Sequence, residues 1–148
     1  MDSTGSDRHQ VVLVREWDRQ MGDSGCCGRL SSDVVGELTG SCTTTGEDPY
    51  AHVRADMARM GAVYRALRER FGDDEIEIVV TDPRNTAWLV PAIWRAARRR
   101  GLPVRDAVRQ VNAATAACTV TCDGVVVATD PEPAEAVAAV VTDLASRR

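Results

Sequence analysis

The stretch ACTVTCDGVVVAT, residues 117–129, carries the clearest structural signal in the chain. Asp123-Gly124 stands between two runs that are rich in β-branched residues. This dipeptide favours the two-residue turn that joins antiparallel strands, because both central residues of such a turn take a positive φ. The pattern therefore predicts a β-hairpin with one strand over 117–122 and an antiparallel strand over 125–129.

The chain before the hairpin predicts two parallel strands joined by a long helix. Residues 11–14 read VVLV and residues 75–81 read EIEIVVT, runs typical of strands that are covered by other elements. Between them, Asp48-Pro49 is a helix start and Gly72 is a helix end. A strand, a helix and a strand in succession predict a right-handed crossover with parallel strands. The apolar side of this helix recurs every three or four residues: Val53, Met57, Met60, Tyr64, Leu67 and Phe71.

Three further helices are expected around and after this unit. A turn at 82–86 leads into an amphipathic helix that we expect to be kinked or restarted at Pro91 and to stop at Gly101-Leu102-Pro103. A short helix is possible over 104–111. The last helix starts at Asp130-Pro131. Its apolar side is predicted to consist of Ala134, Val137, Val140 or Val141, and Leu144.

The length of 148 residues has room for one domain and one core. We expect a disordered tail over 1–9 and a single domain over 10–148. Within this domain, residues 18–49 form a long segment rich in Gly, Ser, Thr and Asp, with a short helical stretch possible over 32–38. A connection of this length in a compact domain is usually functional or mobile.

The composition excludes several classes of protein. The residues are 44% hydrophobic and 27% charged, and no apolar run is long enough to cross a bilayer, so we expect no membrane partner. A net charge of -4 gives no electrostatic reason to expect nucleic acid. The polar start of the chain has no apolar region behind a basic one, which predicts a reducing, cytoplasmic setting. In that setting, five cysteines are more often catalytic or metal-binding than disulfide-bonded.

The element order β-α-β-α-β-β-α over residues 10–147 resembles the thioredoxin-like superfamily. The resemblance implies an α/β fold with a mixed four-stranded sheet, helices on both faces, and functional thiols between the first strand and the first long helix. The segment 18–49 carries three of the five cysteines at that place. The chain departs from the family in having no Cys-x-x-Cys, and it reads Thr115-Ala116-Ala117 where the family has a cis-proline before the hairpin.

Cys26, Cys27 and Cys42 are the candidate catalytic residues. Cys26 and Cys27 are adjacent, so in extended chain their side chains point in opposite directions and a disulfide between them is strained. Arg29 lies close enough in sequence to lower a thiolate pKa, and Cys42 precedes the predicted helix start, whose dipole stabilises a thiolate. We expect Cys26 or Cys27 to attack a protein or small-molecule disulfide partner without a cofactor, and Cys42 to resolve the mixed disulfide.

Two alternatives use the cysteines for metal. Cys26, Cys27 and Cys42 are suited to a soft ion such as Zn, Cu(I) or a metalloid, and their arrangement is similar to that of the arsenical metallochaperone and repressor family. The Cys118-x-x-x-Cys122 spacing is similar to that in thioredoxin-like [2Fe–2S] ferredoxins. On a strand, however, these two residues would lie about 13 Å apart, so a [2Fe–2S] cluster requires residues 117–122 to be a loop. Otherwise Cys118 and Cys122 are small core residues.

The remaining polar residues leave partners open. His9 and His52 are the only histidines, which excludes a centre with several histidine ligands and leaves His52 as a possible base or ligand. The arginine-rich stretch from Arg95 to Arg109 is either a solvated face or a docking site for an acidic protein. A scaffold that works without any thiol chemistry is the third function class. Neither the leading thiol nor the oligomeric state follows from the sequence.

Overall fold

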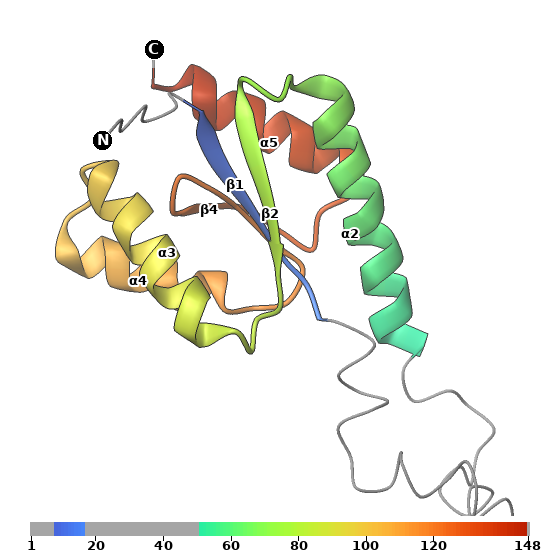
Figure 1. Cartoon of the computed structure of the whole chain (residues 1–148), viewed down its shortest axis with the longest axis horizontal. Coiled ribbons are helices and arrows are strands. Elements are labelled where there is room, and N and C mark those ends of the chain that lie inside the picture. Colours follow the sequence, from blue (N-terminus) through green and yellow to red (C-terminus); the bar gives the residue numbers. More distant parts are fainter. Residues whose placement is uncertain (1–7, 17–50, 148) are drawn as a thin grey trace, which may run out of the picture.

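The fold is a mixed four-stranded sheet between two pairs of helices (Figure 1). The structure, a computed structural model, describes residues 8–16 and 51–147. Within them the sheet has the order β2-β1-β3-β4. Strand β1 pairs in parallel with β2 and antiparallel with β3, which pairs antiparallel with β4. The mixed sheet predicted from the sequence is therefore confirmed. The strands are β1 (His9–Val14), β2 (Ile76–Thr81), β3 (Thr119–Cys122) and β4 (Val125–Thr129).

Helices cover both faces of this sheet. Helices α2 and α5 pack against each other on one face, and α3 and α4 pack against each other on the opposite face (Figure 1). This arrangement agrees with the α/β fold expected from the sequence. None of the described helices combines the length and the apolar composition that a membrane span requires. The helices are α2 (Ala51–Arg70), α3 (Thr86–Arg99), α4 (Val104–Ala114) and α5 (Pro133–Ala145).

The alternation of side chains along β1 explains why both faces are covered. Val11 and Leu13 belong to the core under α2 and α5, whereas Val12 and Val14 belong to the core under α3 and α4. All four side chains are at most 1% exposed. A strand with apolar residues at every position must bury both of its faces, and β1 does so in the centre of the sheet.

The buried side of α2 differs at two positions from the predicted side, since Met57 is only half-buried and Tyr64 is exposed. Val63 is fully buried, whereas Tyr64 is 37% exposed. Val53, Met60 and Leu67 are buried as predicted. A helical period of 3.6 residues allows either of two neighbouring residues to continue the stripe. Val63 belongs to the core under α2 and α5, whereas Tyr64 lines a pocket together with Ile78 and Val80 of β2.

Helix α5 begins two residues later than predicted. Its N-cap is Glu132, whose side chain and that of Glu135 form a reciprocal capping box. Asp130 has a φ of 52°, a left-handed conformation that ends the hairpin and does not start a helix. The buried side of α5 differs from the predicted side in its first turn, where Ala136 is buried and Ala134 is exposed.

Two other helices differ in detail from the predictions. Of the two outcomes expected at Pro91, a kink or a restart, the restart does not occur, because helix α3 continues through Pro91. The proline leaves one carbonyl, that of Ala87, without its helical donor, and Ala87 is exposed, so water can take the place of the missing N–H. Helix α4 extends to Ala114, beyond the predicted end at residue 111.

The hairpin turn has the predicted geometry. Asp123 has a φ of 45° and Gly124 a φ of 77°, which are the positive values that a type I′ turn requires. Gly124 is also the point where helix α3 meets the turn. A Cβ added at Gly124 would lie 2.3 Å from the Ala97 amide nitrogen and 2.7 Å from the Ile93 carbonyl oxygen. Only glycine permits this contact between two backbones.

Replacing Gly124 should destabilise the fold strongly. We expect Gly124→Ala to lower the free energy of unfolding by about 3 kcal/mol, because it adds a clash with rigid helix backbone to the cost of a left-handed φ. Gly101→Ala is the matched control, since Gly101 also has a positive φ but has no atom within 4 Å of an added Cβ. The control should lose about 1 kcal/mol. Urea unfolding measures both values, and equal losses would contradict the close contact.

Candidate functional site

One end of the sheet brings together the residues that could perform chemistry. We call this end, formed by Val14, Thr81, Thr119 and Thr129, the thiol edge. Val14 pairs with Thr81 on one side and Thr119 on the other, and Thr119 pairs with Thr129. Cys118 lies directly before β3 at this edge, and α2 begins at the same end of the molecule (Figure 1).

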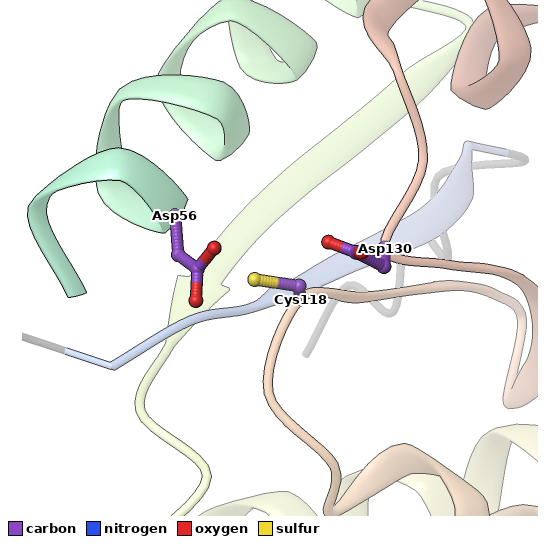
Figure 2. Close-up of side chains that lie close together, drawn as sticks. All are labelled: Asp56, Cys118 and Asp130. Atoms are coloured by element: carbon purple, nitrogen blue, oxygen red, sulfur yellow. The ribbon is translucent and has the colours of Figure 1, made fainter. Parts of the chain in front are cut away.

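Asp56, Cys118 and Asp130 converge at the thiol edge from α2, the start of β3 and the end of β4. One ligand atom from each residue lies within 4.8 Å of the other two. Figure 2 shows the three side chains close together. Cys118 is only 4% exposed, Asp56 is half-buried and Asp130 is exposed. We refer to these three residues as the Asp–Cys–Asp cluster. Among the described residues it is the group of cysteine, histidine and acidic side chains that is close enough to hold a metal ion.

The backbone at the base of the hairpin positions two members of the cluster. The Asp130 amide donates a hydrogen bond of 2.7 Å to the Cys118 carbonyl. Both residues have a positive φ, 55° at Cys118 and 52° at Asp130. Non-glycine residues rarely adopt this conformation, and here it occurs on both sides of one hydrogen bond. The two side chains are therefore fixed next to each other by the backbone, independently of any contact between them.

Arg59 partly neutralises the cluster. Its guanidinium forms an ion pair with Asp130 and lies 3.7 Å from an Asp56 carboxylate oxygen. With the thiol protonated, two carboxylates and one guanidinium leave one negative charge at the site.

Burial keeps the Cys118 thiol protonated. Desolvation raises its pKa to about 11, the charges of Asp56 and Asp130 act in the same direction, and Arg59 opposes them. At pH 7 a thiol with this pKa is a thiolate in about one molecule in ten thousand. Because the thiolate is the nucleophile, Cys118 does not attack disulfides readily at neutral pH.

The second buried thiol, Cys122, lies at the other end of β3. Burial raises its pKa to about 12, with Asp123 adding to the effect, and its sulfur lies 3.5 Å from a terminal nitrogen of Arg147. Cys118 and Cys122 are both unbonded thiols in the core under α2 and α5. Since β3 covers residues 119–122, the loop that an iron–sulfur cluster would need is not formed. The interpretation of these two cysteines as core residues is confirmed.

The three cysteines predicted to be catalytic, Cys26, Cys27 and Cys42, lie outside the described residues, as do Arg29 and the predicted helix start at Asp48-Pro49. The described part of the chain therefore places none of them. His52 is placed, and it is exposed on the first turn of α2.

His9 lies at the far end of β1 from the thiol edge. Its Nδ1 atom is 2.7 Å from an Asp123 carboxylate oxygen. His9 therefore takes no part in the Asp–Cys–Asp cluster.

Sequence patterns did not identify Asp56 and Asp130 as site residues. Asp130 had the pattern of a helix cap, and Asp56 had no signal that set it apart from the other charged residues of α2, although its spacing from Val53 and Met60 places it on the buried side of the helix. The two residues are far apart in sequence, so only the folded sheet brings them to Cys118.

No family model, no curated protein and no solved structure matches this chain. Function therefore has to be inferred from the chemistry of the thiol edge.

The reactivity of Cys118 tests the description of the site. At pH 7.5 iodoacetamide should modify Cys118 at least about tenfold more slowly in the native protein than in the urea-unfolded chain, because the thiol is buried and protonated. Because its pKa is raised, the native rate should increase with pH up to about pH 11. Mass spectrometry of the alkylated peptides separates this cysteine from the others.

A charge variant provides the control. Asp56→Asn should accelerate the modification of Cys118, since it removes a negative charge that raises the thiol pKa. Asp106→Asn, on α4, should leave the rate unchanged. Equal rates for Cys118 in native and unfolded protein would contradict the buried, protonated thiol.

Proposed function

We propose that this protein is a thioredoxin-like thiol protein that exchanges disulfides with a protein or small-molecule partner through Cys26, Cys27 and Cys42. The observed strand order and strand directions agree with the resemblance of the sequence to the thioredoxin-like superfamily. The helices on both faces of the sheet agree with it as well.

The observation that carries this proposal is where the cysteine-bearing segment is attached. The described chain stops at Glu16, two residues after β1, and resumes at Ala51, where α2 begins. Both attachment points belong to the thiol edge. The parallel strands β1 and β2 have their carboxyl ends here, and this is the side of an open α/β sheet where ligands and substrates bind. Residues 17–50 thus connect to the sheet at the position suited to a reactive loop.

The proposed reaction is a two-electron exchange. The thiolate of Cys27 or Cys26 attacks one sulfur of the partner disulfide, forms a mixed disulfide and releases the second sulfur as a thiolate that takes up a proton. Cys42, as thiolate, then attacks the sulfur of the mixed disulfide that belongs to this protein. The partner leaves as a dithiol, and this protein holds a disulfide between Cys42 and the first cysteine. The reverse sequence oxidises the partner.

Cys118 has a different part in this proposal. Its raised pKa argues against Cys118 as the attacking group, which supports a proposal that places the nucleophile among Cys26, Cys27 and Cys42.

Peptide mapping under non-reducing conditions tests the exchange. After mild oxidation, the full chain should contain a disulfide that joins Cys42 to Cys26 or Cys27. Cys42→Ser should reduce glutathione disulfide or insulin at least about tenfold more slowly than the unmodified chain, because nothing resolves the mixed disulfide. Cys118→Ala should retain most of the activity. A Cys42→Ser variant with full activity would exclude the proposed mechanism.

A second candidate function is the binding of Zn, Cu(I) or a metalloid by the same three cysteines. The Asp–Cys–Asp cluster is a separate set of ligands at the end of the sheet where their segment is attached, and it favours zinc among these ions, because thiolate and carboxylate groups are ordinary zinc ligands. With Cys118 deprotonated, the three ligands and Arg59 carry a net charge of two minus, which a divalent cation neutralises. Binding would then displace the proton from a thiol that otherwise holds it tightly. No observation on the described residues favours a [2Fe–2S] cluster.

Co(II), a spectroscopic substitute for Zn(II), distinguishes the second function from the first. Under anaerobic conditions a metal-binding protein should show cobalt–thiolate charge-transfer absorption at one equivalent of Co(II). Changing Cys26, Cys27 and Cys42 together to Ser should weaken the band, and Asp56→Asn should lower the affinity further, whereas Asp106→Asn should not. A chain that gives no such band but forms the Cys42 disulfide would exclude the metal function and leave the redox proposal intact.

A further inference from the structure

A hollow lined by arginines lies at the end of the sheet opposite the thiol edge. It has a volume of about 720 Å³ and is lined by residues of β1, β2, α3 and the hairpin turn. Two carboxylates, Glu77 and Asp123, oppose its four guanidinium groups. The lining thus has two excess positive charges, of which one remains when Asp143 behind it is counted, in a chain whose net charge is -4. We call it the arginine hollow, after its four arginines: Arg8, Arg99, Arg100 and Arg147.

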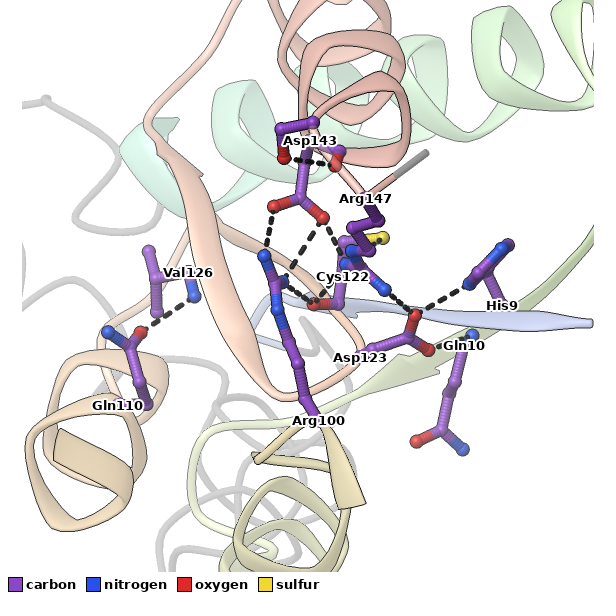
Figure 3. A network of polar contacts seen from close by, with 10 residues as sticks. His9, Gln10, Arg100, Gln110, Cys122, Asp123, Val126, Asp143 and Arg147 are labelled. Carbon is purple, nitrogen blue, oxygen red and sulfur yellow. Dashed lines mark hydrogen bonds and ion pairs between the residues drawn. The ribbon is translucent and has the colours of Figure 1, made fainter. Parts of the chain in front are cut away.

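Two of these arginines are held in place by carboxylates behind them, as Figure 3 shows. Arg100 binds Asp143 through both terminal nitrogens, at 2.7 and 3.2 Å, and also donates to the Cys122 carbonyl at 3.2 Å. Arg147 pairs with Asp123 and Asp143. The Arg100 and Arg147 side chains are only about 20% exposed. Because their conformations are already fixed, a ligand that binds them loses little additional side-chain entropy.

Arg99 is the guanidinium of the hollow that is available to a ligand. It is exposed, and its contact within the described structure is a hydrogen bond of 3.4 Å from Nε to the Arg95 carbonyl. Among the described carboxylates, none forms an ion pair with Arg99. Its terminal nitrogens can therefore bind an anion without breaking an internal ion pair.

Only part of the arginine-rich stretch from Arg95 to Arg109 lines the hollow. Arg99 and Arg100 line it, whereas Arg109 lies on α4 and pairs with Asp106 at 3.0 Å. Arg8 and Arg147 come from the two ends of the described chain. Arginines that are distant in sequence therefore line one concave site. A concave site suits a small ligand better than the flat docking surface of an acidic protein.

The lining also has groups that suit the rest of a ligand. Gln10 and Glu77 are paired residues on neighbouring strands, and both line the hollow. An amide and a carboxylate accept hydrogen bonds from hydroxyl groups, and guanidinium groups form paired hydrogen bonds with phosphate. The volume lies within the range of small-molecule sites. We propose that the arginine hollow binds a small phosphorylated molecule that also carries hydroxyl groups, with its phosphate at Arg99 and Arg100.

Calorimetry with ribose 5-phosphate, at low ionic strength, tests this site on the full chain. Ribose 5-phosphate should bind saturably at one equivalent, inorganic phosphate more weakly, and ribose not measurably. Arg99→Gln should weaken the binding of ribose 5-phosphate by about tenfold or more, since it removes a charge-assisted contact and no internal ion pair. Arg95→Gln, an exposed arginine of the same helix that does not line the hollow, should change the affinity less than about twofold.

A variant that should bind more tightly controls for loss of folding, because a misfolded protein would bind less tightly. Glu77→Gln removes a negative charge from the lining, so it should bind inorganic phosphate more tightly than the unmodified chain. The proposal is overturned if ribose 5-phosphate does not bind, if Arg95→Gln and Arg99→Gln weaken it equally, or if a hexaglutamate peptide binds and ribose 5-phosphate does not. The outcome is separate from the thiol chemistry, because changing Cys26, Cys27 and Cys42 to Ser should leave the binding of ribose 5-phosphate unchanged.

Discussion

Strand β1 pairs with β2 on one side and with β3 on the other, and its residues 11–14 are at most 1% exposed. Burying one aliphatic side chain of this size contributes about 1.5–3 kcal/mol, so four of them match the net stability of an ordinary domain, about 5–15 kcal/mol. Parallel pairing with β2 requires a crossover, which α2 supplies on one face. Antiparallel pairing with β3 brings the hairpin to the opposite side of β1. The other elements are arranged around this strand.

The two ends of the sheet differ in charge, and the difference separates their chemistry. At the thiol edge, two carboxylates share one guanidinium beside a buried thiol, and burial together with these charges keeps Cys118 protonated. At the opposite end the arginines dominate. Burial there would raise the pKa of Asp143, but hydrogen bonds and the charges of Arg100 and Arg147 outweigh it and hold that pKa below its ordinary value. One end therefore suits thiol or metal chemistry, and the other suits an anionic ligand.

Local patterns predicted those elements whose local and tertiary preferences agree. The Asp123-Gly124 turn is confirmed because the positive φ of both residues is a local requirement. The buried side of α2 and the first residue of α5 were predicted less accurately. Val63 and Tyr64 fit the same stripe, and only the packing of α2 decides between them. Asp130 has the local pattern of a helix N-cap, but in the closed hairpin it adopts a left-handed conformation. Glu132 is therefore the N-cap of α5.

The spacing of apolar and turn residues along the chain was enough to predict the alternation of strands and helices, the hairpin and the burial of both faces of β1. The Asp–Cys–Asp cluster and the arginine hollow, in contrast, become visible only in the folded chain. Their residues come from distant parts of the chain, and no periodicity relates them. Their proximity results from strand pairing and helix packing, whose free energy comes mostly from apolar residues elsewhere.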